Sequence, residues 1–323
     1  MNTPEARYIN TPEQGEYWGG FFGAVLRPSI TREVRNSKDS SVHVYYKPRL
    51  QVFDRKEGKL LYIQKNFEGN VRPQSESHTT PDEMGFVRGK GFKWVLGRTG
   101  SIVALLQELE PFVVAQQELV RAMIEFSSAK QERLERYSGG ITEGMNELSE
   151  EREEVEAEFT ERLNRARNNR DQVRLPLTPA NVAGILDASG VIAIARNNRP
   201  ARGYTDYRGK VHITSDNTQL LEAVSAVYGG LVLPVRYGSP PVYSDSRYYW
   251  VTDKVGEVKK VIEDTLPSLV VQRRQAELVQ GFMASQGDII LRNSLRKSSL
   301  PSLNLAAILK EGFYSEVYRL NHE

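Results

Sequence analysis

Strict alternation of apolar and polar residues predicts a β-strand from Val42 to Phe53, because successive side chains of a strand point to opposite faces. The apolar positions are Val42, Val44, Tyr46, Leu50 and Val52, and the polar ones are His43, Tyr45, Lys47, Arg49 and Gln51. The pattern returns later in the chain, where Val211 and Ile213 alternate with Arg208, Lys210 and His212. Each segment therefore predicts a sheet with one face in a hydrophobic core and an opposite face that carries cations.

Helical patterns lie around these strands. Leu60 to Phe67 and Gln219 to Tyr228 are amphipathic and are followed closely by glycine. A further helix is expected to begin after Thr178, which can act as an N-cap before Pro179, and to end at Gly190. The chain thus alternates between helix and strand signals, as a mixed α+β protein does.

The order of these signals occurs twice. The segment FKWVLGRTGSIVALLQELEPFVV (Phe92 to Val114) aligns with YYWVTDKVGEVKKVIEDTLPSLV (Tyr248 to Val270), with Trp, Gly and Pro at the same offsets. Upstream, YKPRLQV matches YRGKVHI, and GGFFGA (Gly19 to Ala24) matches AGILDA (Ala183 to Ala188). Three blocks in the same order indicate a duplicated domain. Each copy predicts the order helix, strand, strand, helix, strand, strand, helix, with a closing helix that runs through Phe126 in the first copy and Ser285 in the second.

The duplication predicts the domain organisation of an α+β protein with two tandem αββαββα domains. We expect the domains over residues 1–126 and 174–286, a charged helical linker over 127–173, and a C-terminal tail over 287–323. The linker contains a break at Ser138 to Gly140 and an acidic stretch from Asn146 to Glu161, which we interpret as a solvated connector. The tail carries Phe313, Val317 and Leu320 at helical spacing, so we expect it to dock on the body.

Composition narrows the possible chemistry. The 323 residues are 39% hydrophobic and 26% charged, which is typical of a globular protein. There is no cysteine and there are only four scattered histidines, so thiol catalysis and cysteine- or histidine-based metal clusters are not expected. No apolar run is long enough to span a bilayer. The first residues lack a signal or transit pattern, so we expect the protein to act where it is made, in a bacterial cytoplasm or an organelle matrix or stroma.

The segment NVAGILDASGVIAI (Asn181 to Ile194) resembles the signature helix and following strand of the LAGLIDADG homing endonuclease family. The segment YWGGFFGAVLRPSI (Tyr17 to Ile30) is similar to a degenerate copy, with about two extra residues before Ser29. The resemblance covers nearly all of both copies and implies the single-chain form, whose antiparallel sheets form a saddle over the DNA major groove. It also implies that the two signature helices pack together through small residues, here Gly19, Gly20, Gly23, Ala24, Ala183, Gly184 and Ala188.

The resemblance also implies one Asp or Glu at the foot of each signature helix, where the pair holds divalent metal ions for DNA cleavage. The matching position in the second copy is Ser189, and in the first copy it is Val25, or Leu26 if the alignment shifts by one residue. Asp187 lies two residues earlier, about 200° around the helix, so we expect it to make a structural hydrogen bond. We therefore expect no catalytic residue and no cofactor, with Mg²⁺ required only if cleavage is retained.

The polar faces of the strands are the predicted nucleic-acid interface. Their side chains are donors of the types that contact guanine edges and phosphates. The candidates are His43, Tyr45, Lys47, Arg49, Gln51, Arg196, Arg208, Lys210, His212 and Arg236. Because the net charge is only +2, the position of the cations matters more than their sum.

We interpret the sequence as a nucleic-acid-binding protein derived from this family that has lost DNA cleavage. Three alternatives remain open: an intron maturase, a structural subunit of a larger ribonucleoprotein assembly that docks through the acidic linker and tail, and an endonuclease that still cuts. The expected partner is double-stranded DNA or structured intron RNA, with no membrane involved, and the expected form is a monomer with an internal pseudo-two-fold. The sequence does not decide between DNA and RNA and does not reveal a target.

Overall fold

The computed structural model describes residues 8–36, 42–74, 91–137, 157–166, 173–199, 204–237, 242–295 and 300–322. The chain divides into two compact units. Unit 1 comprises Met1–Gly19 and Val25–Gln172, and unit 2 comprises Gly20–Ala24 and Val173–Glu323. The division passes through the first helix, so the end of that helix belongs with the second half of the chain.

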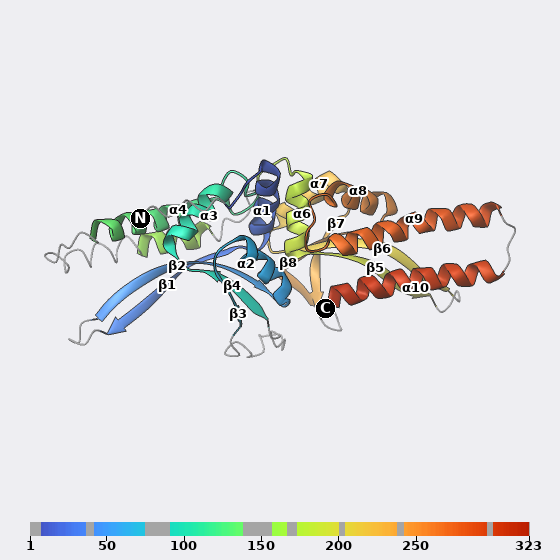
Figure 1. The fold of residues 1–323 in the computed structure, drawn as a ribbon, viewed down its shortest axis with the longest axis horizontal. Helices are drawn as coiled ribbons and strands as arrows, with labels where there is room; N and C mark the ends of the chain where they lie inside the picture. The colour runs from blue at the N-terminus through green and yellow to red at the C-terminus, as the bar shows by residue number, and fades with distance from the viewer. Residues whose placement is uncertain are drawn as a thin grey trace. The chain divides into compact units, whose positions relative to one another are not determined.

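Unit 1 carries a four-stranded antiparallel sheet in the order β1-β2-β4-β3 (Figure 1). Its elements are α1 (Pro12–Val25), β1 (Arg27–Asn36), β2 (Val42–Asp54), α2 (Glu57–Asn66), β3 (Asn70–Pro73), β4 (Phe92–Leu96), α3 (Thr99–Leu109) and α4 (Gln117–Tyr137). The predicted order αββαββα is confirmed for this copy, including the amphipathic helix between the two strand pairs.

Unit 2 repeats the arrangement with a sheet in the order β5-β6-β8-β7. Its elements are α6 (Pro179–Ser189), β5 (Gly190–Arg199), β6 (Tyr204–Ser215), α7 (Thr218–Tyr228), β7 (Leu231–Tyr237), β8 (Val242–Thr252), α8 (Val255–Thr265), α9 (Arg273–Leu295) and α10 (Leu300–His322). The Thr178 hydroxyl accepts from the Asn181 amide at 3.1 Å and closes a capping box, so the predicted start of α6 is confirmed. Together the two units confirm the predicted α+β class.

The end of each copy differs from the prediction, which gave one closing helix. The structure has two, because Pro111 falls in the turn between α3 and α4 and Pro267 in the turn between α8 and α9. Helix α4 runs past Phe126 to Tyr137, and Ser127, the first residue of the predicted linker, is fully buried. The predicted break at Ser138 to Gly140 lies outside the described residues, as does the acidic stretch as far as residue 156. Residues 157–166 are helical.

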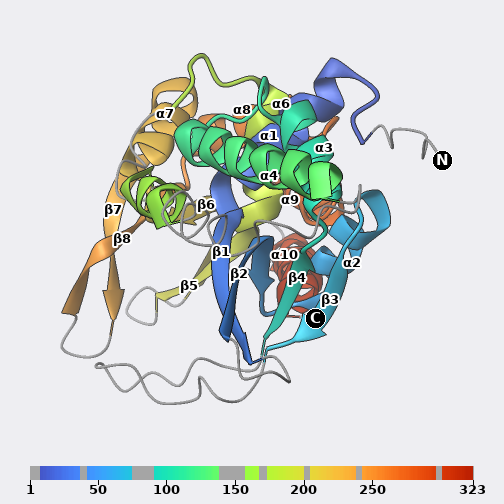
Figure 2. The ribbon, with the colours of Figure 1, turned by 90° about the vertical axis from the view of Figure 1, so that its left-hand side faces the viewer.

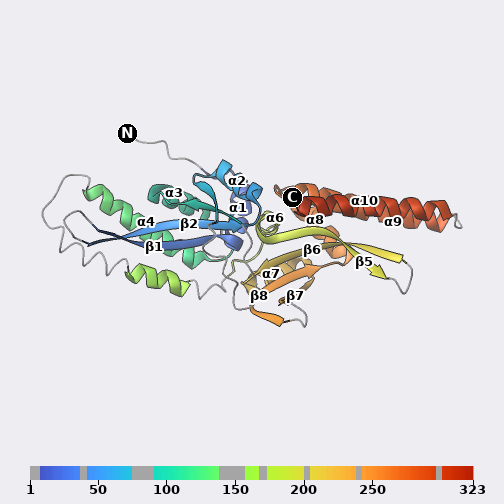
Figure 3. The same cartoon turned by 90° about the horizontal axis from the view of Figure 1, so that it is seen from below.

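Each sheet buries one face beneath helices. In unit 1 Leu50, Val52 and Trp94 are at most 1% exposed, and the strands that carry them pack against α2, α3 and α4 (Figure 2). In unit 2 the sheet packs against α7, α8, α9 and α10. Helices α9 and α10 lie side by side (Figure 1) and run along β5 and β6 (Figure 3). The tail docks as its spacing predicted, with Val317 only 1% exposed.

A tryptophan and a glycine occupy matching places in the two sheets. Trp94 and Trp250 are fully buried, and their indole N–H groups donate to the backbone oxygens of Glu68 at 3.1 Å and Gly229 at 2.7 Å. The glycine that follows has a positive φ in both units, 118° at Gly69 and 85° at Gly230. A Cβ atom at either position would lie 2.6 Å from the indole Nε1 of the tryptophan. The buried ring therefore needs glycine at the entry to β3 and to β7.

We expect Gly230→Ala to lower the free energy of unfolding by about 2 kcal/mol or more. A positive φ alone costs a non-glycine residue about 1–3 kcal/mol, and the added methyl group also meets the indole. Gly256→Ala is the control, because no atom lies within 4 Å of its Cβ position on α8. Chemical denaturation measures both, and equal stability of the two variants would contradict the role of Gly230.

Candidate nucleic-acid interface

The face of the first sheet that points away from the helices carries the polar residues of β2. We call this side of each sheet its open face. Strand pairing brings residues of other strands to the same face, because residues directly opposite one another point the same way. Gln51 pairs with Val95, Val95 pairs with Asn70, and Arg72 pairs with Lys93. Basic side chains from β2, β3 and β4 therefore meet on one surface.

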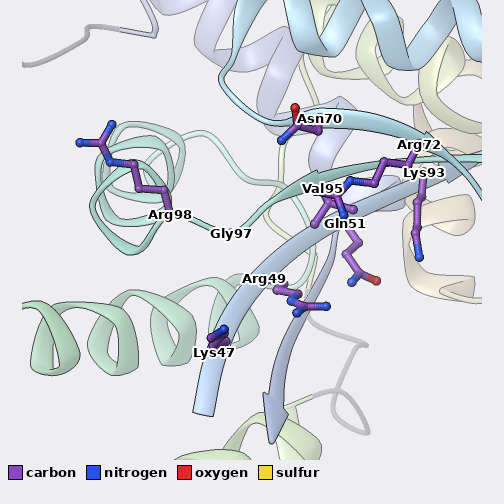
Figure 4. A pocket seen from close by; sticks show the side chains of 9 residues that line it. All are labelled: Lys47, Arg49, Gln51, Asn70, Arg72, Lys93, Val95, Gly97 and Arg98. Atoms are coloured by element: carbon purple, nitrogen blue, oxygen red, sulfur yellow. The ribbon is translucent and has the colours of Figure 1, made fainter. Parts of the chain in front are cut away.

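These side chains surround a hollow of about 330 Å³ (Figure 4). Its lining consists of Lys47, Arg49, Gln51, Asn70, Arg72, Lys93, Val95, Gly97 and Arg98. Five of the nine are cations and none is an acid, so the hollow attracts anions. In Figure 4, Lys47, Arg49, Arg72 and Lys93 come from the sheet, whereas Arg98 lies beyond the end of β4 and points away from them.

One carboxylate at the edge of the hollow partly offsets this charge. Glu33 on β1 accepts from Lys47 at 2.6 Å and from Arg49 at 3.0 Å. The residues that line the hollow beside Arg72 and Lys93 include no acid. The positive potential is therefore concentrated on the β3–β4 side of the hollow.

The second sheet has Arg208, Lys210 and His212 at the alternating positions of β6, as predicted. Arg208 is paired with Asp206 at 2.9 Å and lies 3.8 Å from Asp253. Burial, together with the charge of Lys210, lowers the pKa of His212 to about 4, so His212 is neutral at pH 7. This face therefore has less available positive charge than the first.

The prediction that Arg196 shares the open face with Arg208 is wrong. Arg196 pairs with Tyr207, which is 8% exposed and belongs to the helix-covered face. The Arg196 guanidinium forms an ion pair with Glu311 at 3.2 Å and lies over the ring of Tyr314, both on α10. The alternation of β6 was visible in the sequence, but the register that pairs it with β5 was not.

Three other candidates have less defined positions. His43 and Tyr45 occupy alternating places in β2, opposite Arg35 and Glu33, and their side chains lie outside the described part of the structure. Arg236 is exposed and lies beyond a register shift in the β7–β8 pairing. Because the shift interrupts the alternation, the face to which Arg236 belongs does not follow from β7 alone.

Sequence reasoning missed Asn70, Arg72, Lys93 and Arg98. A signal for Lys93 was present in FKWVL, where Lys93 and Val95 alternate with the apolar Phe92, Trp94 and Leu96. Arg72 sits on a strand of four residues, which is too short for alternation to be recognised. Its place in the hollow depends on pairing with β4, which is a tertiary property.

The helix ends that match the family's catalytic positions carry no acid. Helix α1 ends at Val25, and α6 ends at Ser189, whose hydroxyl lies 3.3 Å from the backbone oxygen of Ile185. Among the described residues no three His, Cys, Asp or Glu side chains come together as a metal-binding group would require. Neither helix end offers the carboxylate oxygens that Mg²⁺ prefers, so the residues present do not fit the metal.

Asp187 has a different role. It is fully buried, and its two carboxylate oxygens accept the amides of Val270, Val271 and Gln272 at 2.8–2.9 Å. These amides lead into α9, so Asp187 caps that helix, and a carboxylate is favoured at a helix N-terminus. These three hydrogen bonds stabilise the start of α9, which agrees with the structural hydrogen bond expected for Asp187.

Two of the small residues predicted to lie between the signature helices, Gly19 and Gly20, lie close to backbone atoms. A Cβ atom on Gly20 would lie 2.1 Å from the backbone oxygen of Asn181, and both residues belong to unit 2. A Cβ atom on Gly19 would instead lie 2.1 Å from the backbone oxygen of Phe112 in unit 1. Because neither glycine has a side chain, α1 can lie against the backbone of Phe112 at Gly19 and against the backbone of Asn181 at Gly20.

The repeated αββαββα units and their open sheet faces define the two-domain LAGLIDADG fold of single-chain homing endonucleases, which the chain shares. I-SmaMI bound to uncleaved DNA target with calcium ions is similar at 11% identity and a TM-score of 0.61, covering 94% of this chain and 98% of that chain. I-GzeII in complex with DNA target is similar at 12% identity and a TM-score of 0.56, covering 92% and 97%. I-AabMI bound to uncleaved DNA has 14% identity and a TM-score of 0.54, covering 94% and 99%.

No protein-family model and no curated protein matches the sequence. In the described part of the chain, no helix is long and apolar enough to cross a membrane.

We expect Asp187→Ala to lower the free energy of unfolding by about 3 kcal/mol, since it leaves three amides at the start of α9 without their acceptor. Ser189→Ala, two residues away, should change it by about 0.5 kcal/mol or less. Denaturant titration of both variants measures the difference. A small effect at Asp187 and a large one at Ser189 would contradict the structural role of Asp187.

Proposed function

We propose that this protein binds double-stranded DNA through the open faces of its sheets and does not cleave it. The observation that carries the proposal is the hollow of the first sheet, with five cations and no acid in its lining. Phosphate contacts by Lys and Arg supply most of the affinity of DNA-binding proteins, and bidentate Arg contacts recognise guanine. The fold supports the proposal, because solved proteins that share it are bound to DNA.

Duplex DNA is favoured over duplex RNA by the shape of the basic surface. The strands β1 and β2 form a long antiparallel ribbon of 10 and 13 residues, and the basic residues of β2 lie on one face of it. The major groove of B-form DNA, about 12 Å wide, admits a two-stranded ribbon. The major groove of A-form RNA is too narrow and deep for side chains to read.

The loss of cleavage follows from the helix ends. Valine cannot coordinate a metal ion, and a neutral serine hydroxyl is a poor substitute for a carboxylate. Asp187 is a poor replacement, because it lies about 200° around the helix from Ser189 and its carboxylate faces the amides at the start of α9. A protein that binds a site without cutting it would act by occupying that site.

The first test is the salt dependence of binding. We expect the triple variant Arg49→Ala, Arg72→Ala, Lys93→Ala to bind duplex DNA more weakly, with a slope of log K against log salt that is shallower by about 0.9 for each lost phosphate contact. A control of equal charge removes three exposed cations away from the hollow: Lys65, Arg121 and Arg165. Fluorescence anisotropy at several salt concentrations measures both. Equal slopes for the triple variant and the parent would contradict the proposed surface, and tighter binding to a structured intron RNA would favour the maturase alternative.

The second test concerns chemistry. Duplexes recovered by selection on the purified protein should remain intact with Mg²⁺ or Mn²⁺, because neither helix end supplies a carboxylate. The double variant Val25→Glu, Ser189→Asp restores an acid at each position. We expect little recovery of cutting, since the first copy has extra residues before Ser29 that displace the acid position. Metal-dependent double-strand cutting by the unmodified protein would restore the endonuclease alternative.

A further inference from the structure

The open faces of the two sheets have diverged at equivalent positions. The buried tryptophans define the equivalence, because Trp94 pairs with Val52 and Trp250 pairs with Ile213. On the side formed by the last two strands, the first sheet presents Asn70, Arg72 and Lys93. The second sheet presents Leu231, Leu233 and Tyr249 at the same places. Three polar or charged side chains of one copy are thus replaced by two leucines and a tyrosine in the other.

The opposite side of each sheet shows the same change. Residues Arg27, Ser29 and Thr31 of β1 lie opposite Gln51, Arg49 and Lys47 of β2. Their counterparts in β5 are Val191, Ala193 and Ala195, opposite His212, Lys210 and Arg208. At these compared positions both sides of the second face are apolar, and the cations lie in β6. Arg247, two residues before Tyr249 in β8, is also exposed.

The apolar side chains of the second face are accessible. Leu231 is 64% exposed, and Leu233, Tyr249 and Val251 are all partly exposed. Single exposed hydrophobic residues are common, but here several lie together on one face of neighbouring strands, which single chance exposures do not explain. Two of the three polar residues of β6 attract phosphate weakly, because Arg208 is paired with Asp206 and Asp253 and His212 is neutral.

We infer that the open face of the second sheet reads thymine through its C5 methyl groups, with Leu231, Leu233 and Tyr249 as the contacting residues, whereas the first face reads guanine through Arg49 and Arg72. The inference rests on the proposed binding of duplex DNA. In the major groove, thymine presents a methyl group that apolar side chains contact, and guanine presents two acceptors that arginine contacts. The protein therefore prefers a target with a guanine-containing part and a thymine-rich part.

A protein partner fits this face less well than a nucleic acid. The cores of protein–protein interfaces are depleted in charged residues, lysine in particular. Here Arg208 and Lys210 stand in the central strand, between the apolar edges. A surface with apolar edges and central cations is suited to a groove that offers both methyl groups and acceptors.

The experiment uses the full chain and duplex DNA selected from a random library. In the selected duplex, each thymine is replaced in turn by deoxyuridine, which removes only the C5 methyl group. We expect the affinity to fall about fourfold for each methyl group that is buried against an apolar side chain. Replacements elsewhere in the duplex should have no effect. This measurement needs no variant protein, so it does not depend on whether a variant folds.

Matched variants then assign the thymines to the second face. The variant Leu233→Arg places in the second sheet the residue that the first sheet has at position 72. At one thymine of the duplex, replacement by deoxyuridine should then no longer lower the affinity. A preference for guanine should appear at that position. Arg72→Leu makes the reverse change in the first sheet. It should relax the preference for guanine and leave the effect of deoxyuridine unchanged. Circular dichroism verifies that both variants are folded.

The outcomes separate this inference from the proposed function. If duplexes bind with the expected salt dependence but every deoxyuridine replacement changes the affinity by less than about 1.5-fold, the inference is wrong and the proposed function stands. If no duplex binds at any salt concentration, both are wrong. If Leu231→Ser together with Leu233→Ser leaves DNA binding unchanged and abolishes self-association detected by sedimentation, the apolar edges form a protein interface and the inference is overturned.

Discussion

The buried tryptophan of each sheet is the contact on which the rest of the structure depends. Its ring fills the helix-covered face, and its indole N–H binds the backbone at the turn that leads into the neighbouring strand. The glycine with positive φ at that turn allows the backbone to lie against the ring. This contact holds β3 against β4 and β7 against β8 in register. Because side chains alternate along a strand, the same register decides which residues reach the open face.

Duplication has preserved this scaffold while the chemistry of the two copies diverged. In the second copy Asp187 caps α9, whereas the first copy has Gly23 at the matching position and Gln116, before α4, adopts a positive φ of 65°. The open faces diverged further, one toward cations and the other toward apolar side chains. A buried face resists change because its side chains are close-packed, and an open face does not.

The helix ends without acids and the cations of the first sheet are the two features on which the proposal of DNA binding without cleavage rests. A metal site needs several oxygen ligands at fixed distances, so the loss of one carboxylate at each helix end removes it. Electrostatic attraction to a polyanion tolerates change more easily, because each cation adds its own contact. Binding can therefore outlast cleavage as a sequence diverges.

The sequence by itself determined the duplicated αββαββα order, the inward and outward sets of β2 and β6, and the missing acids at Val25 and Ser189. These features are local, since they follow from periodicity, capping residues and residue identity. Only the tertiary structure decided that Arg72 and Lys93 join the hollow and that Arg196 turns away to meet Glu311 on α10. The physical reason is that alternation fixes the two faces of one strand, while the pairing register and the helix that covers a face determine which strands share it.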